Sequence, residues 1–363
     1  MSILQKRGIF VGFYKNIPTF AHVCIAMLDK KAMEKRITIK DIAKALNIHH
    51  STVSRALSDD FRIKEETKKR VKAYAEANGY VQNVNALSFR EGVRNVIALI
   101  VPNVHHRFFS NVISYITDYA KSEGFIIAVF QSNESIEEER EIIMNIVQNN
   151  FAGVIASLSM ETKDVSHFEK LAAYHIPLVL FDRVCDGLNV SKVVANSQET
   201  LFNVTTHLIK KGYNKICYLG GLQTLSLFQE RSQGYKDAMN AAGLPFCFHE
   251  VDAEFSKETG ERYTHIAMQT GSNAILCDSY NMALGVHFEL KRLGYSIPKD
   301  VALVSFGNDL SASVLSPSMS LIVQPETNYA KCVFELILDS IKDFKSEKKT
   351  KQVELIFEEK ESS

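Results

Sequence analysis

A short polar cluster between residues 50 and 55 carries side chains suited to nucleic acid. Hydroxyl, imidazole and guanidinium groups donate hydrogen bonds to base edges in the major groove and to phosphate oxygens. No carboxylate occurs in this run before Asp59, so no negative charge within it would repel a phosphate backbone. The spacing therefore predicts a helix that reads DNA, with these candidate contact residues: His50, Ser51, Thr52, Ser54 and Arg55.

Two short helices and a tight turn between Thr38 and Leu57 would hold this cluster. Thr38 and Asp41 resemble a capping pair, and Asn47 tolerates the left-handed conformation that such a turn needs. The pattern predicts a helix-turn-helix with the polar cluster opposite the buried face of the second helix, and with Thr38 as a further DNA contact. Apolar residues recur at the spacing of helices with one buried face, at Ile39, Ile42, Ala43 and Leu46 and then at Ile48, Val53, Ala56 and Leu57.

The run TIKDIAKALN…STVSRAL resembles the DNA-binding headpiece of the lactose-repressor family of bacterial transcription regulators. The resemblance extends from about Arg36 to about Ser362 and implies a headpiece over residues 36–82. It also implies a homodimer that binds pseudo-palindromic operator DNA, with a small-molecule effector in the body.

The resemblance further implies a hinge helix and linker over residues 83–94. The run NVNALSFR matches the family segment that folds in the minor groove and wedges one apolar side chain between base steps. Phe89 stands where the family usually carries Leu, and Ala86 would allow two hinge helices to approach closely. The DNA contacts expected here are Asn83, Ala86 and Phe89. A flexible linker is the alternative.

Charge is distributed unevenly along the chain. The total is zero, but residues 34–94 hold 13 Lys and Arg against 8 Asp and Glu, whereas residues 95–363 hold 24 against 33. A basic module on an acidic body is expected if one end faces DNA. A third helix is predicted over Lys64 to Asn78, in which Lys68, Lys69 and Lys72 either contact phosphate or form a solvated face.

From Val96 onwards, apolar runs alternate with helical patterns. Strands without polar alternation, separated by helices, indicate parallel sheets covered on both faces, so the predicted fold class is doubly wound α/β. The family resemblance implies two lobes, like a periplasmic sugar-binding protein: lobe one over 95–194 plus part of 323–363, and lobe two over 195–322. A last strand is predicted within 352–360, and because no leucine heptad follows, we expect a dimer and not a tetramer.

Open parallel sheets bind ligands beyond the carboxyl ends of their strands. Phe108 and Phe109 follow the first strand of the body, and Ser157 and the pair Asp182–Arg183 end two others. By resemblance to the family, Arg231 falls where an effector-gripping Arg lies, and Phe255 where an aromatic platform lies. An aromatic face with a fork of donors suits a polyol ring.

Two segments depart from the family pattern. Tyr280 and Asn308 lie in segments where the family commonly carries Asp, so fewer carboxylates are expected in the site. The predicted effector-binding residues are Phe108, Phe109, Ser157, Asp182, Arg183, Arg231, Phe255, Tyr280 and Asn308.

Catalytic, cofactor and metal motifs are absent from the sequence. There is no G-x-S-x-G, H-E-x-x-H, P-loop or Rossmann glycine motif. The neighbouring histidines at 49–50 and at 105–106 would point apart on a helix, and no two of the six cysteines form a C-x-x-C. We therefore predict no enzyme, no cofactor and no metal, and expect buried reduced thiols.

Residues 1–33 fit none of these patterns. We expect them to be a non-native or disordered extension, with translation starting at Met33. No apolar run reaches the ~18 residues of a membrane span, and unpaired thiols favour the cytoplasm. We predict a cytoplasmic, dimeric repressor that binds operator DNA and a sugar-like effector.

Two alternatives stay open. One is the same regulator controlled by a protein co-regulator. The other is a sugar-binding protein with a vestigial headpiece, which would need a signal peptide that residues 1–32 do not resemble.

Overall fold

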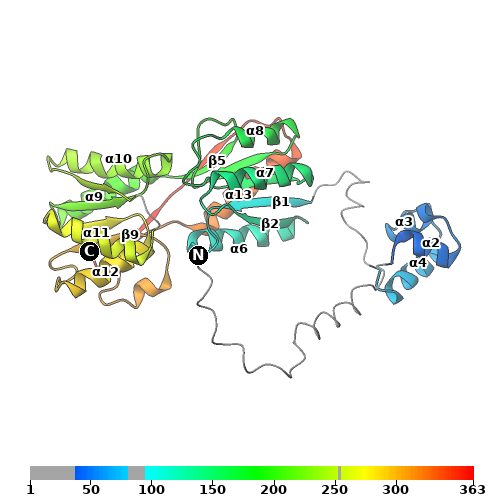
Figure 1. Ribbon diagram of the computed structural model, residues 1–363, viewed down its shortest axis with the longest axis horizontal. Helices are drawn as coiled ribbons and strands as arrows, with labels where there is room; N and C mark the ends of the chain where they lie inside the picture. Colours follow the sequence, from blue (N-terminus) through cyan, green and yellow to red (C-terminus); the bar gives the residue numbers. More distant parts are fainter. Residues whose placement is uncertain (1–36, 81–94, 252–254) are drawn as a thin grey trace, which may run out of the picture. The chain divides into compact units, whose positions relative to one another are not determined.

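The computed structural model describes residues 37–80, 95–251 and 255–363. The chain divides into two compact units, residues 1–92 and 93–363 (Figure 1). The described part of the first unit is the headpiece, and the second unit is the body. The extension over 1–33 and the predicted hinge contacts Asn83, Ala86 and Phe89 lie outside the described residues.

The headpiece contains three helices, α2 (Ile39–Leu46), α3 (His50–Leu57) and α4 (Glu65–Ala77). The predicted capping pair is confirmed, since Thr38 Oγ1 accepts a hydrogen bond from the Asp41 amide and Asp41 Oδ2 accepts one from the Thr38 amide. The turn that follows is also confirmed, because Asn47 adopts the left-handed conformation with φ of 55°. These two features fix where α2 begins and ends.

One small apolar core joins the three headpiece helices. Ile42 of α2, Val53 of α3 and Val71 of α4 are fully buried together. The predicted third helix is confirmed, with Lys64 and Asn78 as its cap residues. The fully buried face of α3 leaves its opposite face available for contacts outside the headpiece.

The first lobe of the body is a six-stranded sheet in the order β11-β5-β4-β3-β1-β2, with all neighbours parallel. Its strands are β1 (Val96–Val101), β2 (Ile126–Gln131), β3 (Gly153–Ala156), β4 (Leu178–Phe181), β5 (Ser191–Ala195) and β11 (Thr350–Val353). Its helices are α6 (Arg107–Ser122), α7 (Ile136–Gln148), α8 (Ser166–Ala173) and α13 (Glu326–Lys342).

The second lobe repeats this strand order as β12-β10-β9-β8-β6-β7, with β12 antiparallel to β10. Its strands are β6 (Ile216–Gly220), β7 (Cys247–Glu250), β8 (Ala274–Cys277), β9 (Ala302–Phe306), β10 (Ser320–Val323) and β12 (Ile356–Glu358). Its helices are α9 (Ser197–Lys210), α10 (Ser226–Ala241), α11 (Lys257–Gln269) and α12 (Tyr280–Arg292), with a short 3-10 helix at Leu310–Ser313.

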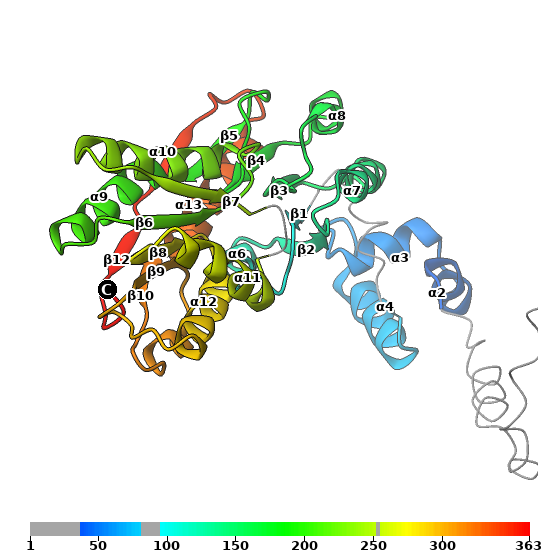
Figure 2. The ribbon, with the colours of Figure 1, turned by 60° about the vertical axis from the view of Figure 1, so that its left-hand side comes forward.

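Both faces of each sheet are covered by helices, as the unbroken apolar strands predict. In β6, Tyr218 packs on Tyr235 of α10, whereas the next residue, Leu219, packs in the cluster that contains Val286 of α12. Figure 1 and Figure 2 show α9 and α10 on one side of the second sheet and α11 and α12 on the other. The predicted doubly wound α/β class with two lobes is therefore confirmed.

Two glycines set the close approach of α11 and α12. A Cβ atom on Gly285 would lie 1.9 Å from the Lys257 carbonyl oxygen, and one on Gly260 would lie 1.9 Å from the Met282 carbonyl oxygen. Because both contacts are with backbone atoms, the helices would have to separate to admit a side chain.

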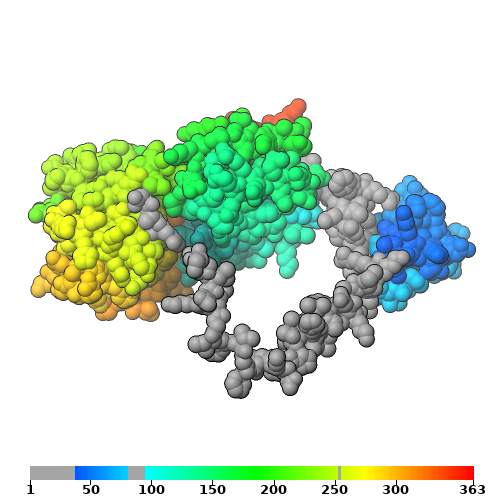
Figure 3. Space-filling view, in the orientation of Figure 1, coloured from blue at the N-terminus to red at the C-terminus, as the bar shows by residue number. Residues whose placement is uncertain are grey.

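The chain passes between the lobes three times, from β5 to α9, from β10 to α13 and from β11 to β12. The prediction of a single last strand within 352–360 is wrong, because the run divides between the two sheets. Leu355, in the link between β11 and β12, donates its amide hydrogen bond to Asn196 Oδ1 at 2.8 Å. Figure 3 shows the lobes as two adjoining masses, one green to teal and the other yellow to orange. None of the described helices is long and apolar enough to span a membrane.

Candidate DNA-binding and effector sites

The exposed face of α3 presents the predicted DNA-reading side chains. His50 and Arg55 are exposed, and Ser51 and Thr52 are half-buried. The ring of His49 caps the helix, with Nδ1 accepting from the Ser51 amide at 3.3 Å. The start of α3 is thus ordered by its own side chains, which holds His50 and Ser51 at the exposed first turn.

Ser54 does not lie on this exposed face. Only 4% of its surface is accessible, and its carbonyl oxygen accepts from Ser58 Oγ at 3.1 Å. The prediction that Ser54 belongs to the outward-facing cluster is therefore wrong. Ser54 is buried together with Val53 and Ala56, so the buried part of α3 extends further around the helix than the sequence pattern predicts.

Two of the three lysines on α4 are engaged within the headpiece. Lys68 is buried and pairs with Glu65 at 2.7 Å, and Lys72 pairs with Asp59 at 2.6 Å. Lys69 is exposed. These pairs favour intramolecular ion pairing over phosphate contact for Lys68 and Lys72. The side chain of Thr38 likewise caps α2. Any contact of Thr38 with DNA, as predicted, would have to form alongside this capping hydrogen bond.

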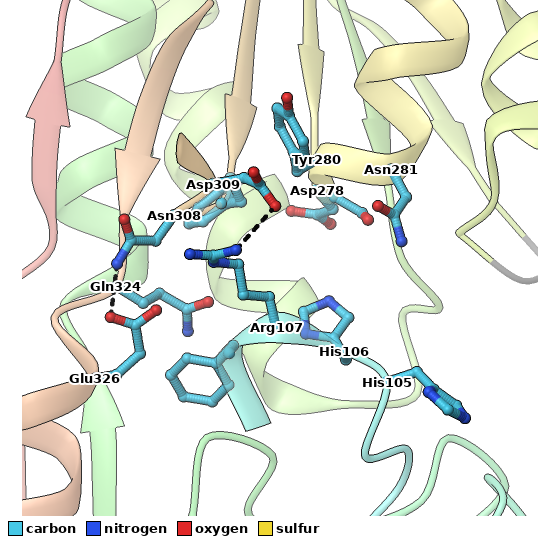
Figure 4. Close-up of a pocket in the computed structure, with 14 residues that line it drawn as sticks. His105, His106, Arg107, Asp278, Tyr280, Asn281, Asn308, Asp309, Gln324 and Glu326 are labelled. Atoms are coloured by element: carbon cyan, nitrogen blue, oxygen red, sulfur yellow. Dashed lines mark hydrogen bonds and ion pairs between the residues drawn. The ribbon is translucent and has the colours of Figure 1, made fainter. Parts of the chain in front are cut away.

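A polar pocket opens in the body at the carboxyl ends of four strands (Figure 4). Segments after β1, β8, β9 and β10 contribute to it, which is where ligands of open parallel sheets are expected. Both lobes supply side chains, because the segment after β1 belongs to the first lobe and those after β8 and β9 to the second. The lining residues are His105, His106, Arg107, Phe108, Asp278, Ser279, Tyr280, Asn281, Phe306, Gly307, Asn308, Asp309, Gln324 and Glu326.

Polar contacts connect the two sides of this pocket. Arg107 at the start of α6 points toward Asp309 of the second lobe, with Nη1 3.5 Å from Oδ2 (Figure 4). Asn308 donates to Glu326 at 2.7 Å, and Gln324 donates to Asp182 at 3.1 Å. The pocket is thus lined by groups whose separation depends on how the lobes are closed.

Arg231 lies behind the pocket. Its Nη1 is 3.0 Å from Asp278 Oδ1, and its guanidinium carbon is 3.6 Å from the ring centroid of Phe306. Only 4% of the Arg231 side chain is exposed, and Arg231 is not among the lining residues, whereas its partners Asp278 and Phe306 are. Arg231 therefore contacts the pocket lining at these two residues.

Asp278 has three hydrogen-bond donors. Tyr218 and Arg231 donate to Oδ1, at 2.7 and 3.0 Å, and the Gly221 amide donates to Oδ2 at 2.8 Å. Burial raises the pKa of Tyr218, and the adjacent Asp278 carboxylate raises it further, so the phenol stays a proton donor. Asp278 is consequently fixed in position at the edge of the ligand space.

Four other predicted effector residues are not among the pocket lining. Phe109 packs on Phe108 with ring centroids 5.3 Å apart, and Arg183 pairs with Glu134 at 2.7 Å. Phe255 packs edge-on against Phe228 at 5.9 Å. Ser157 is fully buried, and its hydroxyl has no hydrogen-bond partner among the described residues.

The structure thus brings Phe108, Tyr280 and Asn308 to the pocket lining and leaves the other six predicted residues outside it. Contact of any of the nine with an effector stays a prediction.

We expected fewer carboxylates here than the family commonly carries, and that comparison stays a prediction. Asp278, Asp309 and Glu326 all line the pocket. Asp278 lies two positions before Tyr280, and Asp309 directly follows Asn308, so an acidic residue stands near each segment that departs from the family pattern. Their place immediately after strands β8 and β9 was a signal that could have identified them from sequence.

A helix-turn-helix headpiece joined to a two-lobed body with a polar pocket defines a class of DNA-binding transcription regulators. Residues 38–83 match the model of bacterial regulatory proteins of the lacI family, and residues 205–363 match that of a periplasmic binding protein-like domain. The headpiece therefore carries a DNA-binding domain of the lacI family, and the curated relatives that the whole chain matches are named as transcriptional repressors.

Relatives of similar length support this assignment. The HTH-type transcriptional repressor PurR of Vibrio atlanticus is 27% identical over 315 residues, which cover 86% of this chain and 94% of that protein. The probable repressor ExuR of Bacillus subtilis is 27% identical, over 80% of this chain and 87% of that protein.

Two solved structures share the fold across both units of the chain. The lac repressor dimer bound to operator and the anti-inducer ONPF has a TM-score of 0.78 at 18% identity, covering 90% of this chain and 99% of that one. The CelR–cellobiose complex has a TM-score of 0.67 at 22% identity, covering 90% and 100%. At these identities the likeness establishes the fold.

Proposed function

We propose that this chain is a cytoplasmic, homodimeric repressor that binds a pseudo-palindromic operator and responds to a neutral, sugar-like effector. The headpiece reads each half-site through α3. The effector occupies the pocket between the lobes and changes their closure, which alters how the two headpieces are presented to DNA. This coupling requires the effector to bind one closure state more tightly than the other.

The hydrogen-bond donors and acceptors that line the pocket are the observation that supports a sugar-like effector. Three carboxylates and the amides of Asn281, Asn308 and Gln324 line it, together with the aromatic rings of Phe108 and Tyr280. Sugar hydroxyls donate to carboxylates and accept from amides, while a sugar ring face packs on an aromatic ring. Sugar-bound relatives of the same fold support this class, because the CelR structure is a complex with cellobiose.

The charge of the lining favours a neutral ligand over an anionic one. Arg107 is the one Lys or Arg among the lining residues, against Asp278, Asp309 and Glu326. Arg107 already contacts Asp309, and a phosphate or carboxylate placed beside these acids would meet net repulsion. We therefore favour an uncharged polyol over a sugar phosphate or uronate.

Binding between the lobes supplies the differential affinity that regulation needs. A ligand that contacts Arg107 of the first lobe and Asp309 or Asn281 of the second completes its contacts only when the lobes are closed. The ligand therefore stabilises the closed state by the free energy of the contacts that an open pocket lacks.

Thermal unfolding of the full chain against a ligand panel tests this proposal. The panel contains neutral mono- and disaccharides, their phosphates, and nucleobases. We expect one neutral sugar to raise the unfolding temperature with concentration, and Asp309→Asn to reduce that shift. Stabilisation by a sugar phosphate alone would contradict the neutral-ligand proposal, and a flat response across the panel would favour a protein co-regulator.

DNA binding is tested separately with sequences selected by the full chain from a random duplex pool. We expect selected sequences to contain two inverted half-sites and to be bound by two copies of the chain. Selection of a single unrepeated half-site would contradict the dimer proposal.

A further inference from the structure

Strand pairing in the second lobe brings two cysteines and a histidine together. Cys217 of β6 lies directly opposite Cys247 of β7 in the parallel register, and His249 is two residues beyond Cys247. Residues two apart on a strand point to the same face, so all three side chains share one face of the sheet. The two cysteines are 30 residues apart along the chain, which explains why no metal motif is visible in the sequence.

The three donor atoms are close enough to bind one ion. The two sulfurs are 3.4 Å apart, and Cys247 Sγ lies 3.5 Å from His249 Nε2. All three atoms lie within 4.8 Å of one another. In tetrahedral zinc sites with metal–sulfur bonds of about 2.3 Å, the donor atoms are about 3.5–3.8 Å apart. A small outward movement of the Cys247 side chain would therefore give tetrahedral spacing.

The donor types select a thiophilic ion. Two thiolates and an imidazole suit zinc-like ions, whereas magnesium and calcium prefer oxygen donors. Thr270 Oγ1 lies 3.7 Å from Cys247 Sγ and is the nearest hydroxyl with a measured contact to the cluster. A tetrahedral ion held by these three donors would have one further position, which a water molecule can occupy.

Charge balance favours a divalent ion in this place. Cys217 is fully buried, and Cys247 and His249 are half-buried. Two thiolates alone would be costly to bury, but a divalent cation neutralises both.

We propose that Cys217, Cys247 and His249 form a binding site for one thiophilic divalent ion of the zinc class. The site lies toward the amino-terminal part of β6 and β7, whereas the polar pocket lies at the carboxyl ends of the strands. A bound ion would link the edge strand β7 to β6 and stabilise the second lobe. This proposal is independent of the effector proposal, because it involves none of the residues that line the pocket.

Cobalt titration of the full chain tests the site. The protein is reduced, treated with chelator, exchanged into chelator-free buffer and titrated with Co²⁺ without oxygen. We expect one equivalent of Co²⁺ to give the thiolate-to-cobalt charge-transfer absorption and the visible bands of a tetrahedral ion, and one equivalent of Zn²⁺ to displace it. Cys247→Ser should abolish the charge-transfer signature of the paired thiolates, and His249→Asn should weaken Co²⁺ binding at least tenfold.

Cys332→Ser is the matched control, because Cys332 lies on α13 of the first lobe and outside the cluster. It should bind Co²⁺ like the wild type. An unchanged spectrum in Cys247→Ser, or no uptake by the wild type, would overturn the proposal. So would a Cys217–Cys247 disulfide, found by peptide mass spectrometry, that forms in reducing buffer in place of metal binding.

A measurement on the wild-type chain keeps the test valid if a variant fails to fold. Zn²⁺ should slow alkylation of Cys247 at least tenfold while the alkylation rate of Cys332 stays unchanged. Equal rates at Cys247 with and without Zn²⁺ would overturn the proposal.

Discussion

The Arg231 guanidinium is paired with the Asp278 carboxylate at 3.0 Å inside the second lobe, and Asp278 is one of the residues that line the pocket. Phe306 covers the other side of the same guanidinium. This arrangement holds the buried Asp278 carboxylate at the edge of the pocket through its pair with Arg231. It explains how a pocket suited to neutral hydroxyls can retain a buried arginine beside it.

Removing the guanidinium should destabilise the protein strongly. Arg231→Met leaves the Asp278 carboxylate buried without its cation, and we expect a loss of about 3–5 kcal/mol in the free energy of unfolding. Urea denaturation measures it. Arg292→Met is the control, because Arg292 is 67% exposed in its pair with Glu289 and should cost no more than about 1 kcal/mol. The Arg231→Met/Asp278→Asn double variant should lose less stability than the sum of the losses measured for the two single variants. A loss equal to that sum would contradict direct coupling between the two side chains.

Arg55→Ala should weaken DNA binding while leaving the fold intact. Arg55 is exposed on α3, so its truncation removes no core contact. We expect a loss of about 1–3 kcal/mol in affinity for the selected operator, with a smaller loss for unrelated DNA. Titration at matched salt measures the ratio. Arg70→Ala, an exposed charge on α4, should lower both affinities alike. An Arg55 variant that keeps the wild-type ratio would show that α3 does not read bases at this position.

His287 should make the body less stable in acid. Burial lowers its pKa below the ordinary 6.5, and the nearby Lys291 charge lowers it further. Above pH 7 the imidazole is neutral in both folded and unfolded chains, so it has no effect. As the pH falls through 6.5, the unfolded chain binds a proton that the folded one refuses, and stability declines down to the folded pKa.

Replacing His287 by Leu should reduce the stability lost between pH 7 and pH 5. Replacement of the exposed His105 by Gln should leave that loss unchanged. Chemical denaturation at the two pH values gives the comparison. If His287→Leu shows the full wild-type loss, the acid sensitivity comes from other groups.

Gly285→Ala should destabilise the second lobe although alanine favours helices. Its Cβ atom would overlap the Lys257 carbonyl oxygen, and the separation of α11 from α12 should cost at least about 1–3 kcal/mol. The gain in helix propensity is about 1 kcal/mol at most. Denaturant unfolding measures the net change, with the exposed Gln269→Ala as a control expected to stay within about 0.5 kcal/mol. A more stable Gly285→Ala protein would show that the helices can separate freely.

Local patterns in the sequence were sufficient for the fold class and for the headpiece. The Thr38 cap, the Asn47 turn and the apolar face of α3 depend on residues within a few positions of one another, and periodicity captures such relations. Unbroken apolar strands likewise predicted covered parallel sheets.

Contacts between residues that are far apart in the sequence could not be predicted from these local patterns. The burial of Ser54, the pairing of Arg231 with Asp278 and the meeting of Cys217 with Cys247 each depend on packing across the fold. The division of the last strand between two sheets has the same origin. β11 and β12 follow each other in the chain, but each pairs at the edge of a different sheet.

The three passages between the lobes restrict how the body can move. The links run from β5 to α9 at Asn196, from β10 to α13 at Gln324 and Pro325, and from β11 to β12 at Glu354 and Leu355. Links this short act together as parallel tethers: sliding one lobe across the other would overextend at least one of them, whereas bending about a shared axis changes only their torsion angles. Rotation of one lobe against the other about an axis through the three links is therefore the relative movement that the links oppose least.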